Sequence, residues 1–232
     1  MKQKVFIYVI IILVLFAVVY GIGIMVINNN FYIKEFTKND DIFQEIKGKS
    51  YRDDCVVPVG ELRYVHILYK NFQGKTKKGE LIVNKHIAQD VLEIFKQLYK
   101  AGYEIESVRL IDEFNADDEM SMENNNSSSF NFRFITHSKK VSKHGYGLAI
   151  DINPLYNPYY KKTDVGEEIV EPINAKEYVD RTKEFKHKID EKDPAYKLFT
   201  EHGFEWGGDW KSCKDYQHFE VPDEFVEKYY KD

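Results

Sequence analysis

The 232-residue chain has no dense basic stretch and no strict alternation of strands and helices. Its 33 Lys and Arg residues face 38 Asp and Glu residues, so the formal net charge is −5. A phosphate backbone would repel this average charge, and no local run of cations offsets the repulsion. The composition therefore argues against a nucleic-acid partner.

Charge is absent from residues 5–27, VFIYVIIILVLFAVVYGIGIMVI, a run of 23 residues. A helix needs about 20 apolar residues to cross the bilayer core, so this run is long enough. Lys2 and Lys4 precede it, which favours a cytoplasmic N-terminus. A cleaved signal peptide is the alternative, but its apolar core is usually shorter and no small-x-small cleavage site precedes Asn28.

The sequence thus predicts a single-pass protein of the cell membrane. It has a cytoplasmic tip at residues 1–4, a transmembrane anchor at 5–27, a polar spacer at 28–51 and an extracytoplasmic domain at 52–232. Without Lys2 and Lys4, 31 basic residues face 38 acidic ones, so the exported part has a net charge of −7.

Strands and helices without βαβ alternation predict an α+β domain. Residues 62–69 and 81–83 predict a hairpin, and Asn84 is suited to cap a helix that runs to about Tyr99 with an apolar stripe on one face. The Asn- and Ser-rich residues 123–129 predict a loop. Further strands are expected at 107–111, 148–152 and 216–221, and helices at 174–189 and 193–201.

His144, Asp151 and His218 are candidate metal ligands, and Asp215 lies three residues before the last of them. Catalytic zinc sites typically keep three nitrogen or oxygen ligands and leave a fourth position for water. A neighbouring carboxylate can accept the proton of that water. His144 and Asp151 are seven residues apart, which would place them on opposite faces of a straight strand, so the interpretation requires a bend. Gly145 and Gly147 could supply it.

The segment SKHGYGLAIDINPLYNPYY resembles the SxHxxGxAxD motif of the VanY-type D-alanyl-D-alanine carboxypeptidases. These zinc peptidases also include L-alanyl-D-glutamate endopeptidases. The resemblance extends over residues 56–221 and includes SSSFNFR, NPLYNPY and HGFEWGGDWKSCKDYQHFE. It implies a hedgehog-like fold, a small antiparallel sheet with flanking helices. It also implies that His144, Asp151 and His218 bind zinc and that Asp215 is the acidic residue of the D/E-x-x-H element.

The sequence departs from this family at the substrate arginine. Many relatives carry it in an SGYR-like motif ahead of the metal motif, whereas the corresponding stretch here, VRLIDEFNADDEM, has none. Arg133 and Arg109 remain as candidates. A guanidinium suits the binding of a substrate carboxylate or the polarisation of the scissile carbonyl, but Arg133 could equally form a structural ion pair.

Several other residues near the motifs have alternative interpretations. Glu205 and Glu220 are rival proton acceptors, and Asp215 could instead fix the tautomer of a histidine. Trp206 and Trp210 could wall a cleft or pack in the core. The two cysteines, Cys55 and Cys213, could form a disulfide, remain free thiols or, for Cys213, bind the metal.

The sequence and the resemblance together predict a membrane-anchored, zinc-dependent peptidase that hydrolyses peptidoglycan stem peptides outside the cell. D-alanyl-D-alanine carboxypeptidase activity is the main hypothesis, with Asp215 as general base and Arg133 as substrate cation. An L-alanyl-D-glutamate endopeptidase and a non-catalytic wall-binding domain are the alternatives.

Overall fold

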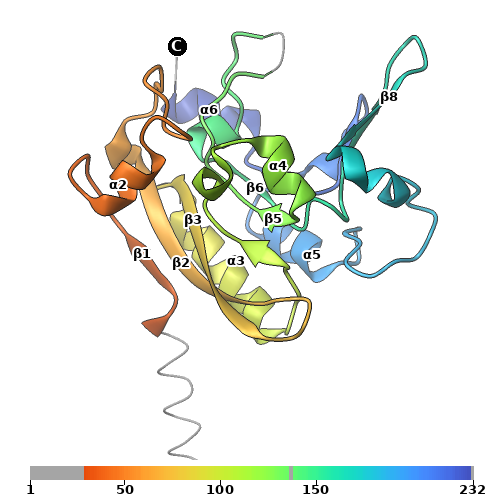
Figure 1. The fold of residues 1–232 in the computed structure, drawn as a ribbon, viewed down its shortest axis with the longest axis horizontal. Helices are drawn as coiled ribbons and strands as arrows, with labels where there is room; N and C mark the ends of the chain where they lie inside the picture. Colours follow the sequence, from red (N-terminus) through yellow and green to blue (C-terminus); the bar gives the residue numbers. More distant parts are fainter. Residues whose placement is uncertain (1–28, 136–137, 231–232) are drawn as a thin grey trace, which may run out of the picture.

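The computed structural model describes residues 29–135 and 138–230 (Figure 1). It confirms an α+β fold, in which small and mostly antiparallel sheets are flanked by helices. No helix within these two ranges is both long and apolar enough to cross a membrane. The predicted cytoplasmic tip at 1–4 and the predicted anchor at 5–27 lie outside the described residues.

The longest strands form the predicted hairpin. β2 (Leu62–Lys70) pairs antiparallel with β3 (Thr76–Asn84) along its whole length, from Leu62↔Asn84 to Lys70↔Thr76. β3 begins well before the expected residue 81. The backbone pairing extends into the polar segment TKKGE, which periodicity alone does not mark as a strand.

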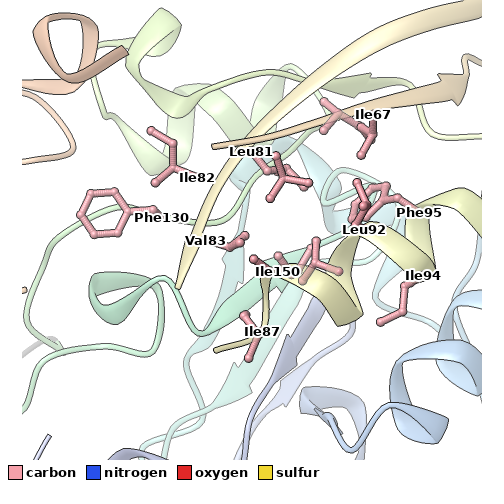
Figure 2. Packing of buried hydrophobic residues seen from close by; sticks show 14 of the residues in the cluster. Ile67, Leu81, Ile82, Val83, Ile87, Leu92, Ile94, Phe95, Phe130 and Ile150 are labelled. Atoms are coloured by element: carbon pink, nitrogen blue, oxygen red, sulfur yellow. The ribbon is translucent and has the colours of Figure 1, made fainter. Parts of the chain in front are cut away.

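Helix α3 (Ala88–Lys100) packs across this hairpin. The Asn84 side chain accepts a hydrogen bond from the His86 backbone N–H, and the regular helix begins at Ala88. Figure 2 shows Leu92 and Phe95 of α3 against Ile67 of β2 and Ile150 of the neighbouring sheet. Burial of each such side chain contributes about 1.5–3 kcal/mol, so this contact forms the main core.

The segment expected to be a spacer packs onto the domain. β1 (Tyr32–Lys34) adds a third strand to the hairpin by pairing with β2, and α2 (Asp41–Ile46) follows. Apolar side chains spaced along this polar segment are buried, namely Phe31, Phe36, Phe43 and Ile46. The burial of these few residues holds the segment against the domain, although its overall polarity suggested a spacer.

A second sheet, in the order β6-β11-β9, carries the sequence motifs. It consists of β6 (Ala149–Asp151), β11 (His218–Glu220) and β9 (Glu205–Trp206). Helix α5 (Pro194–Glu201) covers it: the Phe199 ring stacks on Phe219 at 4.3 Å. The Asp193 side chain caps α5 by accepting a hydrogen bond from the Ala195 N–H. The helix therefore starts where the sequence predicted it.

Residues 123–129 are not a surface loop. β5 (Asn126–Ser127) pairs in parallel with β4 (Ser107–Val108), which is shorter than the expected strand 107–111. The buried Asn126 side chain accepts a hydrogen bond from the Arg109 N–H and donates to the Arg109 carbonyl. Asn and Ser favour turns in general, but here their side chains satisfy buried backbone groups.

The expected helix at 174–189 is also wrong. Only a short 3₁₀ helix, η4 (Ile173–Tyr178), forms there. The chain beyond it is held by Arg181, whose guanidinium donates to the backbone carbonyls of Tyr156 and Ile189. Because these partners are distant in sequence, local propensity does not reveal them.

The remaining elements surround these sheets, and a third sheet lies at the edge of the fold in the order β10-β7-β8 (Figure 1). They are η1 (Val59–Glu61), η2 (Ile111–Phe114), α4 (Asp118–Glu123), η3 (His144–Tyr146), β7 (Tyr159–Lys162), β8 (Glu168–Glu171), η5 (Gly207–Asp209), β10 (Lys214–Asp215) and α6 (Asp223–Tyr229).

Candidate metal centre

Strand register brings Asp151 and His218 together. β6 and β11 are antiparallel, and Asp151 is the direct partner of His218. Side chains of directly opposed residues lie on the same face of a sheet, so the carboxylate meets the imidazole. On its other side Asp151 exchanges two backbone hydrogen bonds with Ser128, of 2.9 and 3.2 Å. The position of Asp151 is therefore fixed from both neighbouring segments.

His144 reaches the same place because the chain bends between η3 and β6. Gly147 has φ +68°, a left-handed conformation that disfavours other residues. A Cβ atom at Gly147 would lie 2.9 Å from the Asn84 backbone N, so a side chain would also clash with the end of β3. The bend required by the seven-residue spacing is thus confirmed, at one of the two glycines suggested for it.

Side-chain atoms of three buried residues converge here. His144 Nε2 lies 3.1 Å from His218 Nδ1 and 3.2 Å from Asp151 Oδ2, and His218 Nδ1 lies 3.0 Å from Asp151 Oδ1. Burial alone would raise the pKa of Asp151, but the charge and hydrogen bonds of His144 and His218 outweigh it and hold that pKa well below its usual value. The carboxylate is thus ionised and able to bind a cation.

The remaining nitrogen of each imidazole contacts an acceptor. His144 Nδ1 lies 2.7 Å from the Ser129 carbonyl oxygen, and His218 Nε2 lies 2.9 Å from Glu220 Oε2. A carbonyl or a carboxylate can only accept, which assigns an N–H to each of these nitrogens. The nitrogens that face Asp151 then carry lone pairs in the neutral rings, the arrangement that metal-binding histidines use.

Zinc fits this donor set. With zinc–ligand bonds of about 2.1 Å and tetrahedral angles, donor atoms lie about 3.4 Å apart. The shortest distances among the three residues are 3.0–3.2 Å, measured to both oxygens of Asp151, and one ligand atom from each residue lies within 4.8 Å of the others. Without an ion, the hydrogen bonds hold His218 protonated: burial lowers its pKa, but bonds to Asp151 and Glu220 raise it to about 10.

Asp215 lies beside these ligands on β10. Its Oδ1 atom is buried and has no hydrogen-bond partner among the described residues. Burial raises the pKa of Asp215 to about 7, the positive charge of His218 opposes this shift, and the negative charge of Asp151 adds to it. A buried acceptor without a partner is rare in a folded protein and is typical of a functional group.

The η5 turn closes over Asp215 because residue 207 is glycine. A Cβ atom at Gly207 would lie 2.6 Å from the Asp215 carbonyl oxygen and 3.3 Å from the His218 Cβ. Of the two tryptophans that flank this turn, Trp206 is buried in the core and donates its indole N–H to the Tyr216 carbonyl. The Trp210 ring instead lies 5.3 Å from the His218 ring, so Trp210 is the one beside the metal ligands.

The two candidate arginines differ in their relation to this centre. Arg133 is close enough that its positive charge opposes the rise in the pKa of Asp215. Its guanidinium forms an ion pair with Asp118, which is the structural alternative suggested for it. Arg109 pairs with Glu113 and lies over the Phe114 ring, and it is absent from the electrostatic surroundings of Asp215.

Glu220 and Ser129 have roles at the site that the sequence interpretation missed. Glu220 contacts the ring of His218, so it serves to position that ring, whereas Glu205 is exposed on β9. Alternation along a strand places residues two apart on the same face, and this could have linked Glu220 to His218. Ser129 contacts His144 through its backbone carbonyl oxygen, which every residue has, so the sequence could not predict this contact.

The cysteines are separate free thiols. Cys55 and Cys213 do not form a disulfide, and burial raises the pKa of the Cys55 thiol to about 11. Cys213 is not part of the group of ligand atoms that lie within 4.8 Å of one another, which comprises His144, Asp151 and His218. The thiolate-ligand alternative therefore has no support in the structure.

Comparison with known proteins agrees with this geometry. No curated protein and no solved structure matches the chain. Residues 136–221 match a family model described as D-alanyl-D-alanine carboxypeptidase. The matched range contains His144, Asp151, Asp215 and His218, so this part of the chain is similar to a peptidase family, and the three grouped ligands could hold a metal ion.

Proposed function

We propose that this protein is a zinc-dependent D-alanyl-D-alanine carboxypeptidase that acts on peptidoglycan stem peptides. The observation that carries the proposal is the convergence of His144 Nε2, His218 Nδ1 and Asp151 beside the partnerless oxygen of Asp215. The family match supports the peptidase class, and the stem-peptide substrate is part of the proposal.

In the proposed mechanism, His144, Asp151 and His218 would hold one zinc ion. A bound zinc makes water nucleophilic at neutral pH and polarises the scissile carbonyl. Asp215 accepts a proton at its free carboxylate oxygen and returns it to the leaving amine. This oxygen is buried and has no hydrogen-bond partner among the described residues, so it is free to accept and to donate that proton.

The surroundings keep the ligands in place during this cycle. The Ser129 carbonyl and the Glu220 carboxylate hold the N–H groups of the two imidazoles, so the rings do not turn away from the centre. Arg133 supplies positive charge near Asp215, where negative charge develops on the substrate.

An L-alanyl-D-glutamate endopeptidase is the second candidate, and one observation favours it. The guanidinium of Arg133 is already paired with Asp118, so it is less available to clamp a terminal carboxylate. An endopeptidase has no need of that clamp.

The products of a muropeptide digest distinguish these functions. Purified zinc-loaded protein is incubated with disaccharide pentapeptides, and the product masses are measured. Loss of one alanine supports the carboxypeptidase, and cleavage between alanine and glutamate supports the endopeptidase. An unchanged substrate would refute both and favour a non-catalytic wall-binding domain.

We also propose that residues 5–27 anchor the enzyme, with the catalytic domain outside the cell. The uncharged run and the preceding Lys2 and Lys4 support this topology. External protease should degrade the domain in intact protoplasts and leave a tag on the N-terminus protected. A secreted chain that lacks residues 1–27 would indicate a cleaved signal peptide instead.

A further inference from the structure

One end of the β1-β2-β3 sheet lies nearest in sequence to the uncharged run. The run stops at residue 27 and β1 begins at Tyr32, so only residues 28–31 separate them. These residues extend over about 14 Å at most. β1 pairs with β2 from Tyr32↔His66 to Lys34↔Tyr64, so the chain joins the sheet beside the middle of β2 and approaches from the side of the Lys70 end.

Lysines gather at this same end of the sheet. Lys75, Lys77 and Lys78 are exposed at and just after the turn between β2 and β3, and Lys100 is exposed at the end of α3. The Nζ atom of Lys70 lies 5.4 Å from the centre of the Tyr99 ring, which places the turn and the end of α3 together. We call the set the lysine end: Lys70, Lys75, Lys77, Lys78 and Lys100.

These lysines are not neutralised within the fold. None of the five forms an ion pair with another residue in the described ranges. The neighbouring carboxylates are engaged elsewhere: Glu104 pairs with Lys186, and Glu106 accepts a hydrogen bond from the Phe72 N–H. Tyr32, which pairs with His66 in the middle of β2, is 43% exposed, and tyrosine is a residue typical of membrane interfaces.

The candidate metal centre lies at the opposite end of the sheet. Asn84 ends β3, and its backbone N–H and side-chain amide donate to the carbonyls of Gly147 and Tyr146, next to His144. A nine-residue strand such as β3 spans about 27 Å. Figure 1 shows β1 beginning at the bottom of the molecule and α6 near the top. Tyr230, the residue that follows α6, packs on Tyr146.

We propose that the lysine end rests on a surface of anionic phospholipid headgroups and orients the domain on the bilayer. The proposal rests on the proposed anchor at residues 5–27. Lysines near an anionic lipid surface are attracted to it within a Debye length, and a chain that approaches the sheet from the same side keeps them near it. Because β1 is fixed in the sheet, the metal centre is held about 27 Å from the lipid surface, facing outward. The enzyme would then act on stem peptides at that height.

Paramagnetic broadening in nanodiscs tests this orientation. The full chain is placed in discs of phosphatidylcholine alone or with phosphatidylglycerol, each containing a lipid with a gadolinium chelate on its headgroup. With phosphatidylglycerol, the amide signals of residues 73–78 should lose at least half of their intensity, and those of residues 144–147 should change little. The variant Lys75→Glu/Lys77→Glu/Lys78→Glu should lose most of this difference. The matched control Lys161→Glu/Lys162→Glu/Lys192→Glu, which reverses exposed lysines elsewhere, should behave like the wild type.

Three results would overturn the proposal: equal broadening at residues 144–147, an unchanged pattern in the lysine-end variant, or a chain that the discs do not retain. Hydrolysis of a soluble pentapeptide provides an independent measurement. It should be the same in the wild type and the lysine-end variant, because those lysines are remote from His144. If neither protein hydrolyses any peptide while the broadening pattern holds, the proposed function fails and the lipid contact stands.

Discussion

His218 depends on three neighbours for its orientation as a ligand. Its Nδ1 atom faces Asp151 and His144, while Glu220 accepts the hydrogen bond of its Nε2–H group. Without that acceptor, the ring could turn or change its tautomer at little cost. The site is therefore built from side chains that are themselves held by hydrogen bonds.

The variant Glu220→Ala tests this positioning role. We expect a 10- to 100-fold loss of zinc affinity, the usual effect of removing such a partner, whereas Glu220→Gln should retain most of the affinity because its amide oxygen can still accept. Zinc competition titration measures both. Glu205→Ala, at the exposed residue opposite Glu220 on β9, is the control and should bind zinc like the wild type. Equal affinity in Glu220→Ala would reject the role.

Asp215 is expected to affect turnover more than metal binding. Asp215→Asn keeps the shape of the side chain but removes the proton acceptor, so kcat should fall about 10²–10⁴-fold while zinc content stays near that of the wild type. Single-turnover hydrolysis and metal analysis of the same sample provide the two measurements. Near-normal turnover would move the acceptor role to another carboxylate.

At the residue scale, sequence patterns identified the residues of the centre but not what holds them. His144, Asp151 and His218 belong to a recognisable motif, and the structure brings them together. A structural ion pair was one of the alternatives predicted for Arg133. The sequence did not identify its partner Asp118, which lies 15 residues away in a segment without a motif. Long-range contacts of this kind depend on the folded backbone.

At the scale of elements, the η5 turn packs closely against β10 at Asp215. Gly207→Ala should lower activity at least tenfold, since a Cβ at 2.6 Å from the Asp215 carbonyl forces the turn or β10 to move. Steady-state kinetics and thermal unfolding measure the effect. Gly60→Ala is the matched control, because a Cβ there meets nothing within 4 Å, and its activity and melting temperature should be unchanged. If Gly207→Ala shows the same behaviour as this control, the close approach is unimportant.

Elements with a strong apolar pattern were predictable, and elements held by polar contacts were not. β2, α3 and α5 follow from β-branched residues, an apolar stripe and a capping Asp. The sequence presents Asn126 only as a turn-forming residue. β5 was missed because the Asn126 amide instead forms hydrogen bonds with the Arg109 backbone. The expected helix at 174–189 failed since Arg181 organises that segment through distant carbonyls.

At the scale of the whole molecule, residues 29–51 are part of the folding unit. Phe43→Ala should cost about 3–5 kcal/mol of unfolding free energy, the usual cost of truncating a buried Phe, because its ring packs 5.2 Å from that of Tyr51. Urea denaturation measures this change. Val56→Ala, at a residue 60% exposed, should cost less than about 0.5 kcal/mol. A similarly small cost for Phe43→Ala would support a separate spacer.

The candidate centre joins segments far apart in the chain, since His144 and Asp151 lie well before His218. Zinc binding should therefore stabilise the whole domain. Saturation at 100 times the dissociation constant contributes about 2.7 kcal/mol, so removal of the metal by a chelator should lower the melting temperature. Differential scanning calorimetry before and after readdition of zinc checks this, and an unchanged melting temperature would indicate that no metal binds the native fold.

The measurement that tests the central claim most directly is the zinc content of the purified protein and of its three ligand variants. We expect about one zinc per chain in the wild type and strongly reduced occupancy in His144→Ala, Asp151→Ala and His218→Ala, with hydrolysis of a stem pentapeptide lost in parallel. Circular dichroism identifies any variant that fails to fold. Full zinc occupancy in all three folded variants would contradict the account.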